Sequence, residues 1–304
     1  MKKLLISTLI ILLFSPLSVF AKTNDKSDIY YTNMNGVQLT EVQYNNLARA
    51  FSDDTIYTMS ATQINLIKDD TTLKSTSSET YVKVNCYYNY SGELVSKSET
   101  DVTKEEYEVF EQPTISLFTA GTYETTMKKI TLSITTGALD VRYITINNKW
   151  KSIPQVKSYD VIAVRIDTDA TLPVIGSQNK GLITGYQKYD GNYVNYDALS
   201  SNTKIIWKNS ITRIVGGVGI SMNILDSVTT SLENEMTVTV NSGATYFTAR
   251  GTYQHATSDV PLADSQKYTI NSGGMGGVIN FTDSTVAAKY DQTGGINVTH
   301  YYLD

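Results

Sequence analysis

The chain has 304 residues, 30 acidic against 25 basic side chains, a net charge of −5 and one cysteine. Such an acidic balance disfavours nucleic acid and anionic membrane surfaces as partners, because both are bound through Lys and Arg. A single cysteine excludes an internal disulfide framework, so packing and strand pairing must supply the stability. The length allows one large β domain or two ordinary domains.

The first 21 residues have the pattern of a secretory signal peptide. Two lysines precede an apolar stretch, Leu4–Leu13, which is shorter than the roughly 20 residues of a membrane span and is followed by Pro16. Small residues before the expected cleavage site predict a cut between Ala21 and Lys22. No cysteine follows that site directly, and no wall-sorting motif stands near the C-terminus, so we expect a secreted, extracellular protein without an anchor.

Charge is distributed unevenly along the remaining chain. Residues 22–120 carry 15 acidic and 8 basic side chains, whereas residues 121–304 carry 15 of each. Together with Pro113 and Gly121, this shift suggests a boundary near residues 113–121. We therefore predict a small acidic α+β region at 22–120 and an antiparallel β-rich domain at 121–304.

Two short helices are predicted early in the acidic region. Thr40 with Gln43, and Ser60 with Gln63, have the spacing of a capping box, in which the first side chain caps the helix and the second bonds back to it. Ser52–Asp54 is predicted to be a turn between the two helices. A helical hairpin of this size is marginal alone and must dock on another element.

The Thr40 segment has a counterpart further along the chain. Residues 39–47 and 102–110 share one pattern: an apolar residue, Thr, any two residues, Gln or Glu, Tyr, any two residues, and a second apolar residue. A duplicated unit of two strands and a helix would explain this. The alternative is that capping boxes look alike wherever a helix starts, as at Thr40 and Thr103.

One segment resembles a known group of sequences. Gly36–Leu47, followed by Phe51-Ser52-Asp53, resembles a stretch of uncharacterised secreted proteins of low-GC Gram-positive bacteria. The resemblance covers about 30 residues and implies export, without implying an activity.

Most of the chain predicts strands. Tyr81–Tyr88 alternates, with Val82, Val84, Cys86 and Tyr88 on one face, and we interpret Cys86 as a buried small hydrophobe rather than a nucleophile. After Thr122 no stretch has a helical period. Strands are predicted there at Lys129–Thr135, Val141–Asn147, Tyr159–Ile166, Leu182–Tyr189, Lys204–Val215, Val218–Ile224, Met236–Val240, Phe247–Tyr253, Lys267–Ile270, Gly277–Phe281, Ala287–Tyr290 and Gly295–Tyr301.

Turn signals between these runs favour an antiparallel β-sandwich or jelly roll. They include Asn147-Asn148, Asp190-Gly191 and the Gly-containing loop Asn241–Ala244. The runs at 218–224, 236–240 and 247–253 alternate most regularly and are expected to form one sheet, with one face on a core and the other in water. Thr237 and Thr239 would lie on the exposed face.

Catalytic motifs are sparse. His255 and His300 lack a third metal ligand at a recognisable spacing and are interpreted as surface strand residues. Two carboxylate pairs have the residue types that glycosidases use, Glu233 with Glu235 in a predicted polar loop and Asp167 with Asp169 at a strand end. Asp167 with Asp169, or Asp190 with Asn192, could also offer oxygens to calcium. Solvated loops are the favoured interpretation of each pair, so we assign no catalytic, cofactor or metal residues.

Two glycine-rich stretches could cradle a phosphate only if a helix followed each of them. Gly216–Gly219 and Gly273–Gly277 are instead interpreted as turns or bulges where backbones approach closely.

Three functional hypotheses remain. The leading one is an exported, non-catalytic protein that binds glycans or protein surfaces through faces and loops rich in its 22 Tyr residues and in Thr, without a cofactor. The second is a secreted hydrolase with carboxylate chemistry on a jelly roll. The third is a pore-forming protein, because Gly217–Val240, interrupted by Leu225–Glu235, alternates like a membrane-inserting hairpin.

Overall fold

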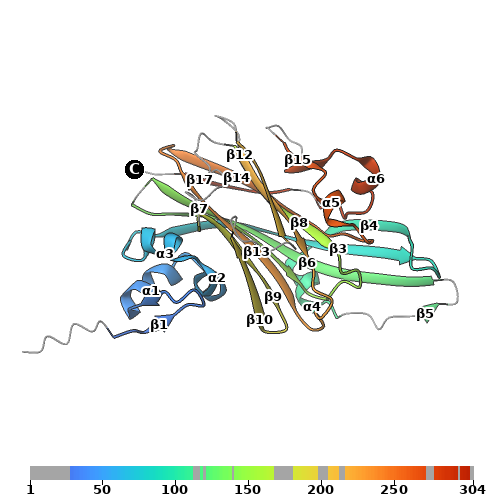
Figure 1. The fold of residues 1–304 in the computed structure, drawn as a ribbon, viewed down its shortest axis with the longest axis horizontal. Coiled ribbons are helices and arrows are strands. Elements are labelled where there is room, and N and C mark those ends of the chain that lie inside the picture. Colours follow the sequence, from blue (N-terminus) through green and yellow to red (C-terminus); the bar gives the residue numbers. More distant parts are fainter. Residues whose placement is uncertain are drawn as a thin grey trace, which may run out of the picture.

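The computed structural model describes residues 28–111, 117–118, 121–138, 140–167, 181–197, 205–211, 216–271, 277–293 and 295–301. The predicted signal peptide and its cleavage site, Ala21 and Lys22, lie outside the described residues, as do Asp169 and Gly273–Gly276. No helix in the described part is long and apolar enough to cross a membrane. The described chain is mainly β, with two antiparallel sheets packed face to face, as the sequence predicts (Figure 1).

The larger sheet has eight strands within the described residues. Seven follow one another in the spatial order β10 (Asn192–Asp197), β9 (Ile183–Tyr189), β13 (Leu232–Asn241), β7 (Val141–Trp150), β6 (Gly121–Thr136), β3 (Lys74–Tyr88) and β4 (Leu94–Val102). The eighth, β5 (Leu117–Phe118), pairs with β6. Because β3 and β4 come from the acidic region and pair into the same sheet as β6, the charge shift near residues 113–121 does not separate two sheets.

In the smaller sheet, the described part of the chain contributes five strands. Their order is β11 (Ile205–Ile211), β12 (Gly216–Asn223), β8 (Tyr159–Ile166), β14 (Tyr246–Gln254) and β17 (Ile296–Tyr301). The inner faces of both sheets share one apolar core, to which the larger sheet contributes Ile144 and Ile146 and the smaller sheet Ile162 and Val164. Period-two alternation therefore predicts the core-facing sets correctly.

The three most regular strands do not lie side by side, which corrects the prediction of one sheet. β12 and β14 belong to the smaller sheet, whereas β13 lies between β7 and β9 in the larger one. The loop Asn241–Ala244 therefore connects two sheets rather than closing a hairpin. The stretch Gly217–Val240 likewise places its two strands in different sheets, so the hairpin that motivated the pore hypothesis is not formed.

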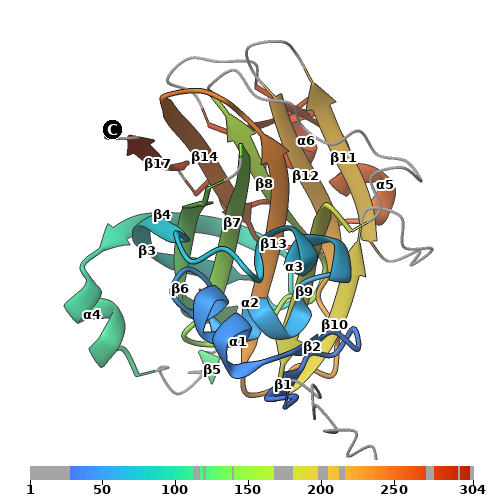
Figure 2. The ribbon, with the colours of Figure 1, turned by 90° about the vertical axis from the view of Figure 1, so that its left-hand side faces the viewer.

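The outer face of β13 is also buried, which corrects the expectation that Thr237 and Thr239 face water. Their exposed fractions are 2% and 4%. Helices from the N-terminal region cover this face of the larger sheet (Figure 2), and Gln63 Nε2 donates to the Thr239 hydroxyl at 3.3 Å. Alternation identifies the two faces of a strand, but a distant segment decides whether the second face meets solvent.

Three helices form this N-terminal cover: α1 (Glu41–Ala48), α2 (Asp53–Thr58) and α3 (Ala61–Ile67). Both predicted capping boxes are present, at Thr40 with Gln43 and at Ser60 with Gln63. The predicted turn at Ser52–Asp54 is wrong, because the Ser52 hydroxyl accepts from the Thr55 amide and caps α2. The helices dock on the sheet through Tyr143 of β7, whose hydroxyl donates to the Gln63 carbonyl at 2.9 Å.

The sequence echo extends to local structure. A hairpin of β1 (Tyr31–Thr32) and β2 (Gln38–Leu39) precedes α1, and the hairpin of β3 and β4 precedes α4 (Lys104–Val109), which Thr103 and Glu106 cap. The turn of each hairpin contains an Asn, Asn33 in the first and Asn89 in the second, whose side-chain Oδ1 accepts hydrogen bonds from two backbone amides. The backbone carbonyl of the same Asn accepts from the amide of a Gly with positive φ, Gly36 or Gly92. The same turn chemistry in both units supports a duplication more strongly than the capping boxes alone.

The C-terminal segment covers the outer face of the smaller sheet. It contains α5 (Leu262–Ser265), β15 (Tyr268–Ile270), β16 (Ile279–Phe281) and α6 (Ser284–Ala287) (Figure 1). Gly217 and Gly219 allow this approach, because a Cβ on Gly217 would lie 2.2 Å from Ile270. The interpretation of Gly216–Gly219 as a turn or bulge is wrong, because these residues lie within β12 and pair in regular register with β8 and β11. The groups that lie nearest Gly217 and Gly219 are side chains, Ile270 and Tyr268 respectively.

Local predictions in the β-rich part had mixed outcomes. The turn at Asp190-Gly191 is confirmed, with positive φ at both residues between β9 and β10. The turn at Asn147-Asn148 is wrong, because both lie within β7 and pair with β6 and β13. The strand at Ala287–Tyr290 is also wrong, because Asp283 caps the short helix α6, which ends at Ala287.

Candidate functional site

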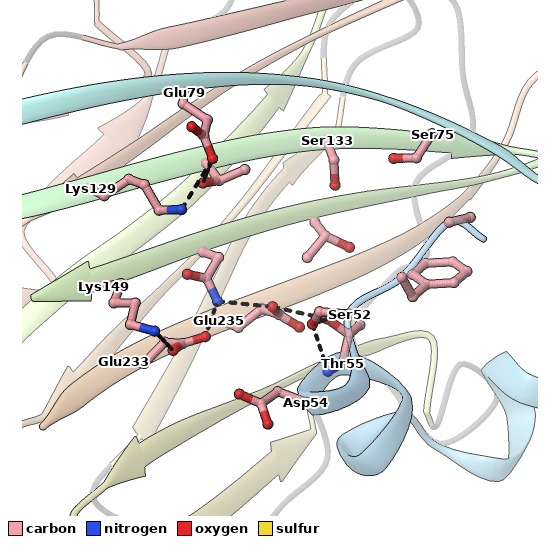
Figure 3. A pocket seen from close by; sticks show the side chains of 15 residues that line it. Ser52, Asp54, Thr55, Ser75, Glu79, Lys129, Ser133, Lys149, Glu233 and Glu235 are labelled. Carbon is pink, nitrogen blue, oxygen red and sulfur yellow. Dashed lines mark hydrogen bonds and ion pairs between the residues drawn. The ribbon is translucent and has the colours of Figure 1, made fainter. Parts of the chain in front are cut away.

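A polar cleft of about 390 Å³ lies on the outer face of the larger sheet, beside the chain that connects α1 to α2 (Figure 3). Its floor comes from β3, β6, β7 and β13, and its rim includes Phe51, Ser52, Asp54 and Thr55. The same helices that bury Thr237 and Thr239 leave this part of the sheet open, so the cleft begins where the helical cover ends.

Strand register brings the floor residues together. Glu79 of β3, Thr131 of β6, Asn147 of β7 and Glu235 of β13 stand opposite one another in a row across four strands. Each belongs to the outward-facing set of its strand, so alternation directs all four to one surface. Four segments that are far apart in sequence thus form one polar floor.

Glu233 and Glu235 form a close pair on one wall. Asn147 Nδ2 donates to Glu233 Oε1 at 2.7 Å and to Glu235 Oε2 at 3.0 Å. The Tyr186 hydroxyl reaches the same two oxygens at 2.8 and 3.3 Å, and Thr55 Oγ1 donates to Glu235 at 3.1 Å. These shared donors hold both carboxyl groups in fixed positions.

The two carboxyl groups differ in environment. Burial raises the pKa of Glu235 to about 8, and the charge of Glu233 adds to this effect, although hydrogen bonds from Asn147 and Thr55 oppose it. Glu235 is therefore mostly protonated at neutral pH. Lys149 lies 3.7 Å from Glu233 and provides that carboxylate with a positive neighbour. A carboxyl group with a raised pKa that lines a polar cleft is typical of functional sites.

The other wall carries a second carboxylate. Glu79 accepts from the Tyr81 hydroxyl at 2.5 Å and from Lys129 Nζ at 3.1 Å. The Tyr81 hydrogen bond, together with Lys129, lowers the pKa of Glu79, so it is ionised at neutral pH. Glu79 on β3 and Glu235 on β13 are separated by three interstrand spacings, about 14 Å between their backbones across the sheet. A ligand can lie between their side chains.

Asp54 marks the rim of the cleft at the start of α2. Lys188 Nζ donates to it at 2.6 Å, and the Tyr193 hydroxyl also donates to it. Burial raises the pKa of Asp54, but these two hydrogen bonds outweigh that effect and lower it overall. The contact fixes α2 against β9 and β10, so the rim is held by strands as well as by the helix.

The structure corrects the predicted location of Glu233 and Glu235. They lie within β13, not in a polar loop, because β13 begins at Leu232 and pairs with both β7 and β9. Asp167 lies on the opposite sheet and binds Arg165 and Arg250, and its predicted partner Asp169 is outside the described residues.

The structure does not support a calcium site at Asp190 and Asn192. Asp190 uses both carboxylate oxygens to accept from the backbone amides of residues 229–231. Among the described residues, no group of three or more His, Cys, Asp or Glu side chains is arranged to hold a metal ion.

The two histidines have different surroundings. His255 is buried, which corrects its interpretation as a surface residue, and its Nδ1 lies 2.9 Å from Asp160. His300 of β17 is half-buried and contacts the hydroxyls of Thr76 and Thr136. Cys86 is buried with its predicted neighbours, and burial raises the pKa of its thiol to about 11.

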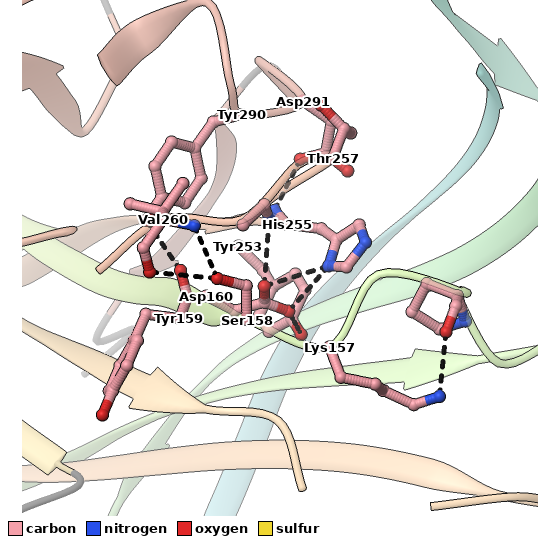
Figure 4. Close-up of polar contacts among 12 residues, drawn as sticks. Lys157, Ser158, Tyr159, Asp160, Tyr253, His255, Thr257, Val260, Tyr290 and Asp291 are labelled. Carbon is pink, nitrogen blue, oxygen red and sulfur yellow. Dashed lines mark hydrogen bonds and ion pairs between the residues drawn. The ribbon is translucent and has the colours of Figure 1, made fainter. Parts of the chain in front are cut away.

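His255 belongs to a buried polar cluster that the sequence did not reveal (Figure 4). Asp160 accepts from His255, the Tyr253 hydroxyl and the Ala256 amide, while Asp291 accepts from the His255 amide and from Lys128. The sequence does contain one signal of this cluster, because the period-two alternation of β6 places the charged residue Lys128 on the inward face of the strand. The satisfied hydrogen bonds indicate a structural role for this cluster.

Comparison with protein-family models finds no match, and no curated protein matches the chain.

Proposed function

We propose that the protein is exported and binds a polyhydroxylated ligand of the glycan class in the polar cleft. The observation that carries the proposal is the fixed array of Asn147, Glu233 and Glu235, which shares the cleft with Lys129 and Glu79. Each sugar hydroxyl both donates and accepts, so a site for it needs acceptors and donors at fixed spacing.

Further features of the cleft fit such a ligand. Ser133, Thr131 and Thr145 add hydroxyl groups to the floor, and Phe51 gives the rim an apolar surface. Two tyrosines that are not among the lining residues hold carboxyl groups of the cleft, because the hydroxyls of Tyr186 and Tyr81 donate to Glu233 and Glu79. The abundance of Tyr noted in the sequence therefore supports the proposed site indirectly, rather than as a flat aromatic face.

The test is a glycan array with the mature protein, followed by titration calorimetry on any hit. Glu233→Gln removes a charged acceptor and should weaken binding about 10- to 100-fold, the equivalent of about 1.5–3 kcal/mol. Glu235→Gln should change affinity only a few-fold at pH 7, because a protonated carboxyl and an amide both donate. Glu93→Gln, in the exposed β3–β4 turn, is the matched control and should have no effect.

The pH dependence provides a second readout. Wild-type affinity should fall as pH rises through about 8, where Glu235 ionises and loses its donor, whereas Glu235→Gln should not show this loss. An array without hits, or equal affinities for Glu233→Gln and the control, would contradict the proposal.

A hydrolase acting on glycosidic bonds is the second candidate. The raised pKa of Glu235, about 8, suits a general acid, and ionised Glu79 stands on the opposite wall. Turnover of a bound glycan by the wild type, lost in Glu235→Gln while binding persists, would favour this candidate. Binding without turnover would favour the non-catalytic one.

A further inference from the structure

Lys128 and Asp291 form an ion pair in the interior of the sandwich. Lys128 belongs to β6 of the larger sheet, and Asp291 lies between α6 and β17, 163 residues further along the chain. Both side chains are 0% exposed, and Lys128 Nζ lies 2.6 Å from Asp291 Oδ2. An amine and a carboxyl group are therefore in contact at a position that is closed to solvent.

An ion pair is an unfavourable way to connect two segments inside a protein. Taking an ammonium and a carboxylate out of water carries a large free-energy penalty, which their mutual attraction offsets fully only in the best geometries. The next residue, Lys129, pairs instead with Glu79 at the polar cleft, where water reaches both groups. Condensation of Lys128 with Asp291 to an amide would remove both buried charges and keep the connection.

The contacts of the pair hold the reacting atoms in place. The His255 amide donates to Asp291 Oδ1 at 2.7 Å, and the Tyr253 carbonyl accepts from Lys128 Nζ at 3.3 Å. Oδ2 thus faces the amine, while Oδ1 faces an N–H group that can stabilise negative charge on it. Asp291 Cγ lies one C–O bond beyond Oδ2, which places the amine close to the roughly 3–3.5 Å separation at which enzymes hold reacting atoms.

Strand β4 fixes the segment that carries Asp291. Lys97 donates from Nζ to the carbonyl oxygen of Tyr290. Glu99 accepts from the amide of Gln292 at 2.5 Å. Asp291 is therefore held by contacts at the residues on both sides of it. A fixed orientation of this kind is a main source of rate when two groups of one molecule react.

We propose that Lys128 and Asp291 condense to an intramolecular amide, which links the larger sheet covalently to the segment that enters β17 of the smaller sheet. A C–N bond forms between Nζ and Cγ, and the bond between Cγ and Oδ2 breaks. Two of the three ammonium protons pass to Oδ2, which leaves as water, and the third stays on the amide nitrogen. Oδ1 becomes the amide oxygen and keeps its hydrogen bond from His255. In a molecule that has not reacted, the pair remains an ion pair.

Two aromatic rings favour the amide over its hydrolysis. The ring centres of Trp150 and Tyr253 lie 5.6 and 5.3 Å from Lys128 Nζ, so apolar surface rather than bulk water flanks the bond. The amide closes a loop between residues 163 apart, which restricts the unfolded chain as a disulfide does. With a single cysteine, the chain has no internal disulfide that could supply this constraint.

The intact mass of the folded and then denatured protein tests the proposal. The wild-type chain should be lighter than its sequence mass by one water, about 18 Da, and proteolysis should release a branched peptide that joins Lys128 to Asp291. The full sequence mass, still present after several days of incubation of the folded protein, would overturn the proposal. Water lost elsewhere, as in a succinimide at Asp190-Gly191, would overturn it too, and the peptide map locates the loss.

Two lysine variants identify the amine. Lys128→Arg keeps a cation beside Asp291 but has no amine that the carboxyl group can acylate, so it should show the full mass. Lys129→Arg, the matched control at the next position, should lose water as the wild type does. On a denaturing gel the wild type should migrate faster than Lys128→Arg, because the amide closes a loop in the unfolded chain. Loss of water that persists in Lys128→Arg would refute the assignment.

Discussion

Removing the charge of Lys128 should be among the most destabilising single changes in the described part of the sandwich. Lys128 and Asp291 are both 0% exposed, and their charged atoms are 2.6 Å apart. The ammonium also lies 5.6 Å from the ring centre of Trp150 and 5.3 Å from that of Tyr253. Lys128→Met keeps most of the volume but leaves the Asp291 carboxylate buried without its cation.

The expected cost follows from that uncompensated charge. Breaking a buried ion pair by removing one partner lowers the free energy of unfolding by about 3–5 kcal/mol, a large share of the 5–15 kcal/mol of a typical domain. Asp291→Asn in the Lys128→Met background removes the stranded charge and can keep the acceptor for the His255 amide. The double variant should therefore recover about 2 kcal/mol or more relative to Lys128→Met.

The next residue of β6 offers a matched control. Lys129 points to the other face of the strand, and its ion pair with Glu79 has side chains 29% and 37% exposed. Lys129→Met should cost less than about 1 kcal/mol. Urea titration followed by tryptophan fluorescence measures all three variants, because Trp150 lies in the core. Equal costs for the two lysine substitutions, or no recovery in the double variant, would refute the reasoning.

Three further predictions concern single sites. Burial lowers the pKa of His255, but the charge and hydrogen bond of Asp160 outweigh this and raise the pKa above its ordinary 6.5. The stability advantage of wild type over His255→Gln should therefore be largest below about pH 6.5 and shrink as pH rises. A pH-independent difference between the two proteins in urea titrations would contradict this. Val238→Asp and Thr239→Asp should both cost several kcal/mol in thermal melts, because both positions are buried, and a tolerated Thr239→Asp would mean that the helical cover is displaced. Cys86→Ser should lower stability by about 1–2 kcal/mol without affecting ligand binding, and native Cys86 should react slowly with thiol reagents.

Local signals in the sequence determined the short-range structure. The capping boxes at Thr40, Ser60 and Thr103 and the turn at Asp190 were readable because each depends on residues within a few positions of one another. The inward faces of the strands were readable for a similar reason, since period-two alternation is a property of each strand alone. Fold class followed from the number of such strands.

Only the tertiary structure decided which strands are neighbours and what covers their outer faces. Nothing near Met236 indicates that β13 leaves its sequence neighbours for β7 and β9, because pairing is chosen by contacts across the whole chain. The same long-range choice sets Glu235 opposite Asn147 in the cleft and buries Thr239 beneath Gln63. The face of a side chain is a local property, whereas its burial, its pKa and its partners depend on segments far away in the sequence, as for Glu235 and Thr55 at a separation of 180.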